Sequence, residues 1–212
     1  MYSEGYYRGR ESSRSFVTEG KLLYEMLHPI PNSRILEVGC GGGAFLAFLE
    51  SKGHVTTGVD VLEEAINAAR KVATRSDILF ADAGDLPFPD SSFDCLISQH
   101  LVEHLEDLTG VLAEWRRVLD DGGVMAMCTP NSRYPRPSFF HDPNHVHIYD
   151  SEELREVVSR AGFRVENCRT VFPHLLKGGI SARVGVPLYR VFETLPPFRD
   201  RGRSLLLSAY KT

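Results

Sequence analysis

The chain has 212 residues, of which 42% are hydrophobic, 25% charged and 10% aromatic. This composition excludes disordered, collagen-like and fibrous proteins, and it predicts one compact domain over residues 1–212. The formal charge of −4 gives no electrostatic reason to expect nucleic acid or an anionic bilayer as a partner.

The cysteines and the N-terminus indicate a cytoplasmic protein. The four cysteines are widely spaced and contain no Cys-x-x-Cys pair, so the sequence predicts neither a disulfide framework nor a zinc knuckle. The first residues lack a cationic head followed by an apolar stretch, and no run approaches the ~18 apolar residues of a membrane span. We therefore expect no signal peptide and no transmembrane segment.

Short apolar runs rich in β-branched residues alternate with helical segments, a pattern typical of α/β winding. An N-terminal helical segment is expected within residues 1–30, and helices with a single apolar stripe are predicted over 62–73 and 108–119. A further helix begins at Asp150, with Glu153 three residues later in a capping-box-like pattern. Seven strands are predicted, at 34–38, 54–60, 78–81, 93–98, 124–129, 164–171 and 205–211.

Two stretches do not fit this winding. Residues 130–149 are rich in Pro, Asn and His, and residues 173–202 combine basic and apolar residues. Loops this long within a compact domain are usually functional lids or interface elements, so we expect both to be lid insertions. For the second insertion core packing is favoured, and a peripheral membrane contact or a homodimer contact stay open.

The strongest functional signal is the run Ile35-Leu-Glu-Val-Gly-Cys-Gly-Gly-Gly-Ala-Phe-Leu46, in which a predicted strand enters a Gly-x-Gly-x-Gly loop and then a helix. Glycines let a ligand approach the backbone, and the helix N-terminus offers unpaired amides and a partial positive charge. Asp60 ends the next strand, well placed to accept two hydrogen bonds from a ribose diol. Together these features predict a nucleoside-binding half-fold.

Two further acids indicate which nucleoside binds there. Glu37 lies two residues before the first glycine, where a carboxylate would repel a pyrophosphate but would hold a cationic amino-acid group. Asp82 closes the third strand and offers an acceptor to an adenine amino group. This combination favours an aminoacyl nucleoside that carries a sulfonium.

A nicotinamide-dependent oxidoreductase is the first alternative, because Gly39, Gly41 and Ala44 also satisfy a dinucleotide-binding pattern. Such an enzyme predicts a proton-donating pair such as Tyr-x-x-x-Lys. None of the eight tyrosines has a lysine four residues later. The sequence therefore favours the sulfonium nucleoside.

With these motifs the chain resembles the class I S-adenosylmethionine-dependent methyltransferases, in particular the small-molecule, methyltransferase type 11-like enzymes similar to those of ubiquinone and menaquinone biosynthesis. The resemblance rests on residues 37–43, Asp60, the segment 82–94, the turn Glu103-His104-Leu105 and residues 119–123. It implies an α/β fold with a Rossmann-like, doubly wound, seven-stranded sheet that is mostly parallel. The last strand is expected to be antiparallel.

The resemblance also implies S-adenosyl-L-methionine as cofactor, with S-adenosyl-L-homocysteine as its product. It assigns Glu37 and the glycines to the methionine moiety, Asp60 to the ribose and Gln99 to the position below the sulfonium. It also matches Tyr6 and Tyr7 to the aromatic N-terminal segment that often covers the cofactor in this family. The implied cofactor-binding residues are Tyr7, Glu37, Gly39, Cys40, Gly41, Asp60, Val61, Asp82, Ala83 and Gln99.

Histidines supply the candidate catalytic groups. His145 and His147 alternate within the segment 141–147, so an extended backbone would place them on the same side. An imidazole with an unperturbed pKa of ~6.5 is suited to take a proton from a hydroxyl or phenol as it is methylated. His104, just after the fourth strand, is the third candidate, and hydrogen bonding to the backbone is the alternative for each.

Two weaker assignments concern the same region. Divalent metal binding by His145 and His147, with His141 or Asp142, is less favoured than a role at the acceptor, and no metal site is predicted. His100 is a weaker catalytic candidate.

The predicted activity is transfer of the activated methyl group to a small-molecule acceptor, with oxygen favoured and nitrogen, carbon and sulfur still open. The sulfonium supplies a good leaving group, so in-line positioning, worth up to ~7 to 11 kcal/mol, is the main task of the protein. The remaining alternative is a partner protein that binds S-adenosylmethionine without catalysis. The sequence identifies neither the acceptor nor the oligomeric state, because unrelated substrates share this fold and these cofactor motifs.

Overall fold

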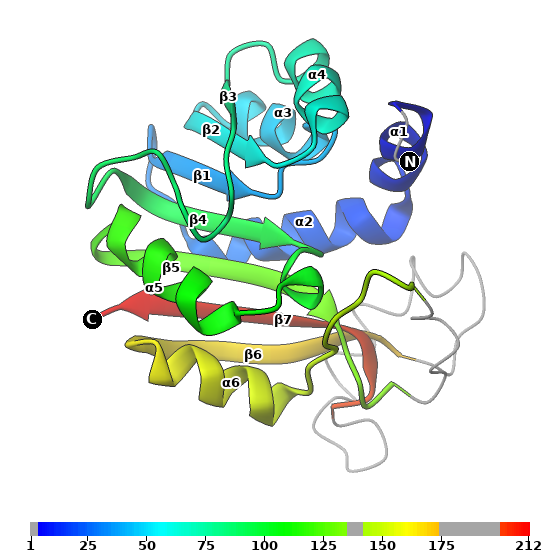
Figure 1. Cartoon of the computed structure of the whole chain (residues 1–212), viewed down its shortest axis with the longest axis vertical. Coiled ribbons are helices and arrows are strands. Elements are labelled where there is room, and N and C mark those ends of the chain that lie inside the picture. Colours follow the sequence, from blue (N-terminus) through cyan, green and yellow to red (C-terminus); the bar gives the residue numbers. More distant parts are fainter. Residues whose placement is uncertain (1–3, 135–141, 174–199) are drawn as a thin grey trace.

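A computed structural model describes residues 4–134, 142–173 and 200–212 of the chain. Within these ranges the protein forms a seven-stranded sheet in the order β3-β2-β1-β4-β5-β7-β6, with helices on both faces (Figure 1). The central parts of the two expected insertions lie outside the described residues. So do His141 and most of the segment considered for a membrane or homodimer contact.

Six strands run in one direction and β7 runs in the other. β1 pairs in parallel with β2 and β4, whereas β7 pairs antiparallel with both β5 and β6. The expected Rossmann-like sheet, mostly parallel with an antiparallel last strand, is therefore confirmed. The strands are β1 (Arg34–Val38), β2 (Val55–Asp60), β3 (Asp77–Phe80), β4 (Phe93–Gln99), β5 (Leu119–Pro130), β6 (Phe163–Pro173) and β7 (Gly202–Lys211).

The helices fill the connections between strands and precede the first one. None of the helices that the structure describes is long and apolar enough to cross a membrane. Asp150 caps one of them as its sequence pattern predicts, because its carboxylate accepts from the amides of Glu152 and Glu153. The helices are α1 (Glu4–Glu11), α2 (Arg14–Leu27), α3 (Ala44–Ser51), α4 (Glu63–Val72), the 3-10 helix η1 (Val102–His104), α5 (Leu108–Val118) and α6 (Ser151–Arg160).

Side chains of the central strands alternate between two buried faces. In β4, Cys95 and Ile97 pack in a cluster with residues of α2 and α3, whereas Leu96 packs in a cluster with residues of α5 and α6. Because both faces are covered, these strands read as continuous apolar runs in the sequence. On α5, Trp115 is fully buried, and its indole N–H donates to the carbonyl of Ala83 at 3.1 Å.

The direction in which the connections leave the sheet reverses at β1. From β1 the chain passes to β2 and β3 on one side, and it then returns to β4 on the other side. In doubly wound sheets ligands bind beyond the carboxyl ends of the strands at this reversal. Helix α1 and the segment 142–150 lie beyond these strand ends, on the right in Figure 1.

Two glycines at the ends of α3 allow a test of the loop geometry. Gly43 (φ 82°) and Gly53 (φ 84°) both have left-handed backbones, so alanine costs ~1 kcal/mol at each. Only at Gly43 would the new Cβ lie 2.8 Å from the backbone of Ala69, whereas nothing lies within 4 Å at Gly53. We expect Gly43→Ala to lower the free energy of unfolding by ~1 to 3 kcal/mol more than Gly53→Ala. Urea denaturation followed by the fluorescence of Trp115 measures both, and equal losses would contradict the clash.

Candidate functional site

The glycine loop after β1 forms one wall of a cavity of about 320 Å³. Gly39, Gly41 and Gly43 have φ values of 76°, 52° and 82°, a left-handed region that other residues rarely adopt. The amides of Gly39 and Cys40 donate to the carbonyl of Val59 at 2.9 and 3.0 Å, which holds the loop against the end of β2. The other lining residues are Tyr6, Tyr7, Arg10, Asp60, Val61, Leu62, Gln99, His100, Leu101, His104 and Asn144.

Asp60 links the glycine loop to the start of α4. Its Oδ2 accepts from the amide of Gly41 and its Oδ1 from the amide of Leu62, each at 3.0 Å. Burial raises the pKa of Asp60, although these amides lower it in part. A carboxylate has about four acceptor positions, so Asp60 keeps acceptor capacity for a ligand in the cavity.

Glu37 is a buried acid behind the glycine loop, with 2% of its surface exposed. Among the described residues its Oε2 has no hydrogen-bond partner. Burial, together with the negative charges of Glu11 and Asp60, raises its pKa well above the usual value. An orphaned carboxylate oxygen is costly unless a cation or donor reaches it, so this side of the loop favours a positively charged ligand group.

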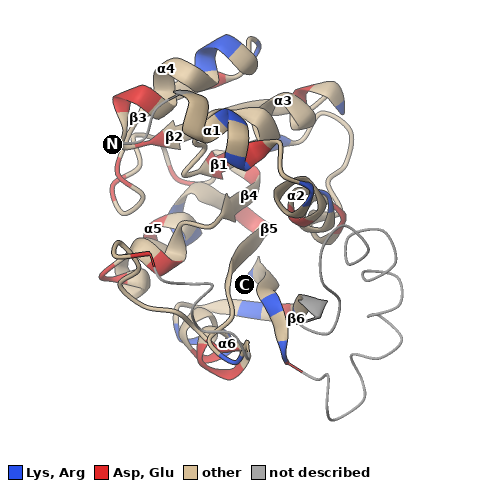
Figure 2. Cartoon of the chain, turned by 90° about the vertical axis from the view of Figure 1, so that its right-hand side faces the viewer, with Lys and Arg blue, Asp and Glu red and all other residues tan. Residues whose placement is uncertain are grey.

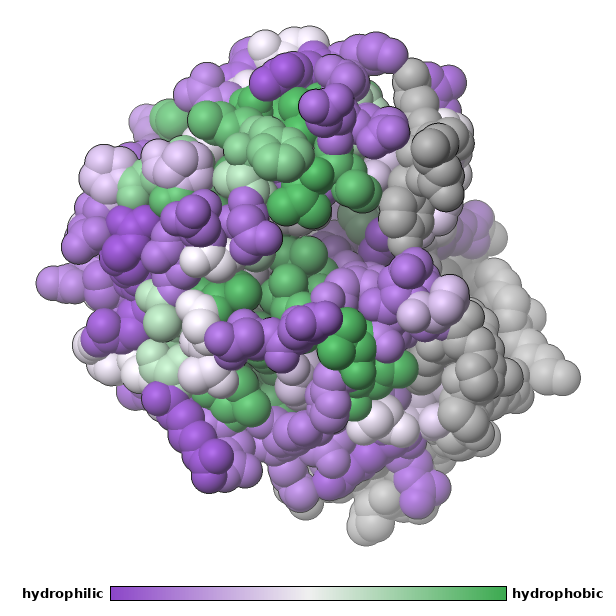
Figure 3. Space-filling view, viewed as in Figure 1, coloured by the Kyte–Doolittle hydropathy of each residue, from purple (hydrophilic) through white to green (hydrophobic). Residues whose placement is uncertain are grey.

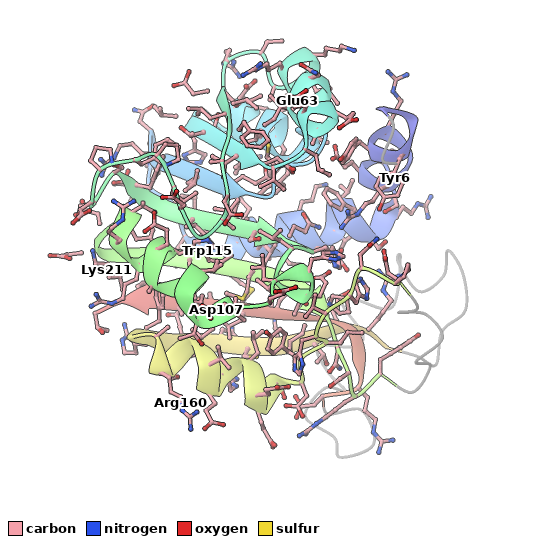
Figure 4. All side chains as sticks on the ribbon, in the orientation of Figure 1. Tyr6, Glu63, Asp107, Trp115, Arg160 and Lys211 are labelled. Atoms are coloured by element: carbon pink, nitrogen blue, oxygen red, sulfur yellow. The ribbon has the colours of Figure 1, made fainter. Side chains whose placement is uncertain are left out.

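Helix α1 lines the cavity with Tyr6, Tyr7 and Arg10. An acid of this helix that sequence reasoning missed, Glu11, fixes it to the glycine loop. Glu11 accepts from the amide of Gly42 at 2.6 Å and from that of Ala44 at 3.1 Å, so it caps α3, whose own N-cap Gly43 has no side chain. Tyr6 lies on the same helix beyond the strand ends (Figure 4). Figure 2 views this edge and shows basic and acidic segments side by side on α1.

The structure brings only part of the predicted cofactor residues around this cavity. Six of the ten line it, namely Tyr7, Gly39, Gly41, Asp60, Val61 and Gln99. The other four, Glu37, Cys40, Asp82 and Ala83, do not. Asp82 is exposed and its Oδ1 accepts from the amide of Gly84 at 2.8 Å, and Ala83 is buried beneath Trp115. Both residues still follow β3, the neighbour of β2, at the same edge of the sheet.

Cys40 is buried inside the glycine loop with 3% of its surface exposed. Burial and then the charges of Glu37 and Asp60 raise the pKa of its thiol well above the usual value. The thiol is therefore neutral and packs with Leu46 and Ile66 as a small apolar group.

Exposed apolar side chains continue the same edge. Val61 and Leu62, which line the cavity, are 48% and 36% exposed, and Phe80 at the end of β3 is 63% exposed. Figure 3 shows apolar surface in the part of the molecule where Figure 1 places β3. A flat apolar ligand group, such as a nucleobase, finds packing surface here.

A second cavity of about 260 Å³ adjoins the first. Tyr6, Arg10, His100 and His104 line both cavities, so their side chains mark the border. The second cavity is polar, and its walls come from α1, α2, η1, the segment after β5 and the start of β7. Its ionisable lining residues are Tyr6, Arg10, Glu19, His100, Glu103, His104, Asp142, His145 and Arg203.

A buried ion network lies beneath the second cavity. Glu19 and Glu103 are each 1% exposed, and His100 lies between them. The ring nitrogens of His100 are 3.1 Å from Oε2 of Glu19 and 3.3 Å from Oε1 of Glu103. Ser204 donates to Glu19 at 2.5 Å and Thr129 donates to Glu103 at 3.0 Å. The network thus joins α2, η1, β5 and β7.

The charges of this network follow from its packing. Burial lowers the pKa of His100, but the effects of Cys128, Glu19 and Glu103 outweigh burial and raise it well above 6.5. Because burial raises the pKa of the Cys128 thiol to about 12, that thiol is neutral near pH 7 and the two carboxylates supply the charge. The stabilisation from protonated His100 is complete below pH 6.5 and is lost as the pH rises through its folded pKa.

The three histidines predicted to be catalytic separate in the structure. His104 and His145 both line the second cavity, and their ring centroids lie 4.9 Å apart. His147 lines neither cavity, and its Nε2 lies 2.7 Å from Oε1 of Glu153 on α6. The expectation that His145 and His147 face the same side is wrong, because the segment bends between them instead of being extended.

Glu19 and Glu103 are site residues that sequence reasoning missed. Glu19 lies three residues after Phe16 and four before Leu23, on the apolar stripe of α2. An acid on a buried stripe is rare unless it is paired, and this signal was available from the sequence. For Glu103 the sequence offers one signal, its place in the turn that carries the family resemblance.

Comparisons with known proteins identify the relatives of this chain. Residues 36–127 match a family model described as a methyltransferase domain. A Mycolicibacterium smegmatis protein named as a probable S-adenosylmethionine-dependent methyltransferase is 31% identical over 168 residues, which cover 78% of this chain and 65% of that protein. An O-methyltransferase from Aspergillus sclerotiorum is 30% identical over 195 residues, which cover 81% of this chain and 74% of that protein.

Solved structures support the same relationship at the level of the fold. The crystal structure of an S-adenosylmethionine-dependent methyltransferase from Archaeoglobus fulgidus superposes with a TM-score of 0.75 at 22% identity, covering 97% of this chain and all of that one (100%). The present chain spans less than two thirds of the length of the M. smegmatis relative.

The ion network predicts how His100 titrates. We expect its imidazole to stay protonated at pH 7.5, and Glu19→Gln to lower its pKa because one negative charge and one strong acceptor are lost. Histidine ring NMR over pH 5 to 9 measures this shift. His147, which pairs with Glu153 outside the network, serves as the internal control and should not change. A His100 that titrates near pH 6.5 in both proteins would contradict the network.

Proposed function

Because the chain belongs to the class I S-adenosylmethionine-dependent methyltransferases, we propose that it transfers the methyl group of S-adenosyl-L-methionine to a hydroxyl of a small polar molecule. Two adjoining cavities that share His104 carry this proposal. The first suits the cofactor and the second suits the acceptor. An O-methyltransferase among the relatives supports oxygen as the acceptor atom.

Residues that line the first cavity, together with Glu37 behind its glycine loop, fit the cofactor. The orphaned Oε2 of Glu37 provides the negative charge that an α-ammonium group needs. Asp60 has acceptor positions left for a ribose diol, and the exposed Val61 and Leu62 offer packing surface to a base. Oε1 of Gln99 is also buried without a partner among the described residues, and it lies at the end of β4. When bound, the cofactor supplies a methyl group activated by a sulfonium.

His104 and His145 are the groups that meet the acceptor. Nδ1 of His104 lies 2.9 Å from the carbonyl oxygen of Asn144, which only accepts, so Nδ1 carries a proton and the lone pair of the neutral ring is on Nε2. An imidazole in this state takes a proton from a hydroxyl, which is worth about 10² to 10⁴-fold in rate. His100 does not serve as this base, because it is already protonated between two carboxylates.

Holding the acceptor oxygen in line with the methyl group supplies more than proton transfer does. Effective molarities of well-oriented groups correspond to ~7 to 11 kcal/mol. The buried network beneath the second cavity holds His100 and Glu103 in one arrangement, so the cavity wall is rigid. Loss of an imidazole should therefore slow methyl transfer without preventing cofactor binding.

Cofactor identity is tested by calorimetry with S-adenosylhomocysteine and, separately, NADH. We expect the wild type to bind S-adenosylhomocysteine and not NADH. Asp60→Asn should weaken binding at least tenfold, or ~1.4 kcal/mol, because the remaining acceptor positions of the carboxylate are lost. Binding of NADH alone would identify a nucleotide-binding oxidoreductase instead. A screen of phenols and hydroxy acids for S-adenosylhomocysteine release then separates an enzyme from a non-catalytic binding protein.

Glu37 predicts a proton linked to binding. In the free protein its pKa is raised by burial and by Glu11 and Asp60, and an ammonium group beside it would lower that pKa again. Binding of S-adenosylhomocysteine near pH 7 should therefore release protons, seen as a binding enthalpy that depends on the ionisation enthalpy of the buffer. In Glu37→Gln this release should disappear and affinity should fall at least tenfold.

The control for Glu37→Gln is Glu63→Gln, which removes an equal charge from the exposed start of α4 (Figure 4). It should keep both the affinity and the proton release. The free energy of unfolding of ligand-free Glu37→Gln should not fall below that of the wild type by more than ~0.5 kcal/mol, because the lost carboxylate oxygen had no partner. A large loss of stability would show that Glu37 has a structural role instead.

A further inference from the structure

Three side chains at the border of the two cavities form a potential ligand set. Glu103, His104 and His145 each offer one ligand atom, and all these atoms lie within 4.8 Å of one another. Ligands of one transition-metal ion at ~2.0 to 2.2 Å lie about 3 to 4 Å apart, so small side-chain movements close the set. Two imidazoles with one carboxylate are typical of divalent zinc and iron sites that keep open positions.

The hydrogen bonds of His104 prepare it as a ligand. Its Nδ1–H donates to the carbonyl of Asn144, which leaves the lone pair of Nε2 directed elsewhere. A histidine that ligates a metal usually donates its other ring N–H to a carbonyl or carboxylate in this way. The carbonyl comes from the residue directly before His145, so one loop orients both imidazoles.

Glu103 keeps acceptor capacity although it is buried. Its Oε1 faces His100 and its Oε2 accepts from Thr129, which uses two of about four acceptor positions. A buried carboxylate oxygen with acceptor positions to spare is what a cation requires.

The loop that carries His145 is fixed to η1 by backbone hydrogen bonds. The amides of Val146 and His147 donate to the carbonyl of Glu103 at 2.8 and 3.2 Å. Asp142 closes the turn before His145, because its Oδ1 accepts from the amide and the side chain of Asn144. The segments that carry Glu103 and His145, some forty residues apart in the sequence, are thus held together by backbone hydrogen bonds. Asp142 also lines the second cavity.

A neighbouring cluster of Glu19, His100 and Cys128 also has its atoms within 4.8 Å of one another, but it suits a cation less well. Both ring nitrogens of His100 already lie against carboxylate oxygens, of Glu19 and Glu103, so neither is directed at a shared ion. In the Glu103 cluster only Nδ1 of His104 is used by the carbonyl of Asn144.

We propose that Glu103, His104 and His145 bind a divalent transition-metal ion at the border between the two cavities, with open positions that face the acceptor. The ion can bind whether or not the protein is a methyltransferase, whereas the role of the ion in methyl transfer rests on the proposed function. A divalent ion lowers the pKa of a hydroxyl that it contacts. The hydroxyl then loses its proton to solvent, its oxygen forms the bond to the methyl carbon, and the electron pair of the broken C–S bond passes to sulfur. With the ion bound, the two imidazoles activate the acceptor through the ion, whereas in the metal-free protein His104 is the base described under the proposed function.

The test uses Co²⁺ as the probe, added to untagged protein after chelator treatment. We expect one ion per chain, with visible absorption that reports nitrogen ligation. His104→Ala, His145→Ala and Glu103→Gln should each weaken Co²⁺ binding at least tenfold. The matched control is His147→Ala, which removes a histidine of the same loop that pairs with Glu153 outside the cavities and should bind Co²⁺ like the wild type. Circular dichroism verifies that each variant is folded. If Glu103→Gln does not fold, the comparison of His145→Ala with His147→Ala still tests the site.

Two results would overturn the metal site: no stoichiometric Co²⁺ binding by the wild type, or equal loss of binding in His145→Ala and His147→Ala. Titration with S-adenosylhomocysteine in parallel separates this inference from the proposed function. If S-adenosylhomocysteine binds and Co²⁺ does not, the metal site is wrong and methyl transfer still stands. If Co²⁺ binds through these three residues and S-adenosylhomocysteine does not, the metal site stands and the methyltransferase activity is wrong.

Discussion

The backbone amides of the glycine loop need acceptors, and the carboxylates that satisfy them come from two other elements. Asp60 at the end of β2 accepts from Gly41, and Glu11 at the end of α1 accepts from Gly42 and Ala44. Without Glu11 the first amides of α3 would have no capping side chain, because its N-cap is a glycine. This requirement ties α1 to the loop, and α1 then supplies two tyrosines and an arginine that line the first cavity.

The same arrangement concentrates negative charge behind the loop. Burial, together with the charges of Glu11 and Asp60, raises the pKa of Glu37, and Oε2 of Glu37 has no hydrogen-bond partner among the described residues. Ionisation of Glu37 is therefore costly in the free protein. Binding sites often lower the stability of the free protein in this way, because groups that a ligand needs are left without partners when the site is empty.

The second cavity has buried acids that are paired. Glu19 and Glu103 are as deeply buried as Glu37, but His100 lies between them, and Ser204 and Thr129 satisfy further oxygens. Paired and fully bonded charges rigidify a wall without demanding a ligand. The two cavities thus differ in electrostatics. Behind the first, one carboxylate oxygen of Glu37 has no partner among the described residues, whereas the acids of the second are paired with His100 and Arg203.

The winding of the sheet, the glycine loop and Asp60 can be predicted from the sequence alone, because strand, loop and helix follow one another within a few residues and their geometry depends on local backbone preferences. The unusual acid at position 19 is visible there too. Which histidines share a cavity depends on contacts between distant segments. His145 reaches His104 because the amides after it bind the carbonyl of Glu103, while His147 turns to Glu153. Such pairings join segments about forty residues apart through backbone atoms, which every residue has, so no side-chain pattern in the sequence records them.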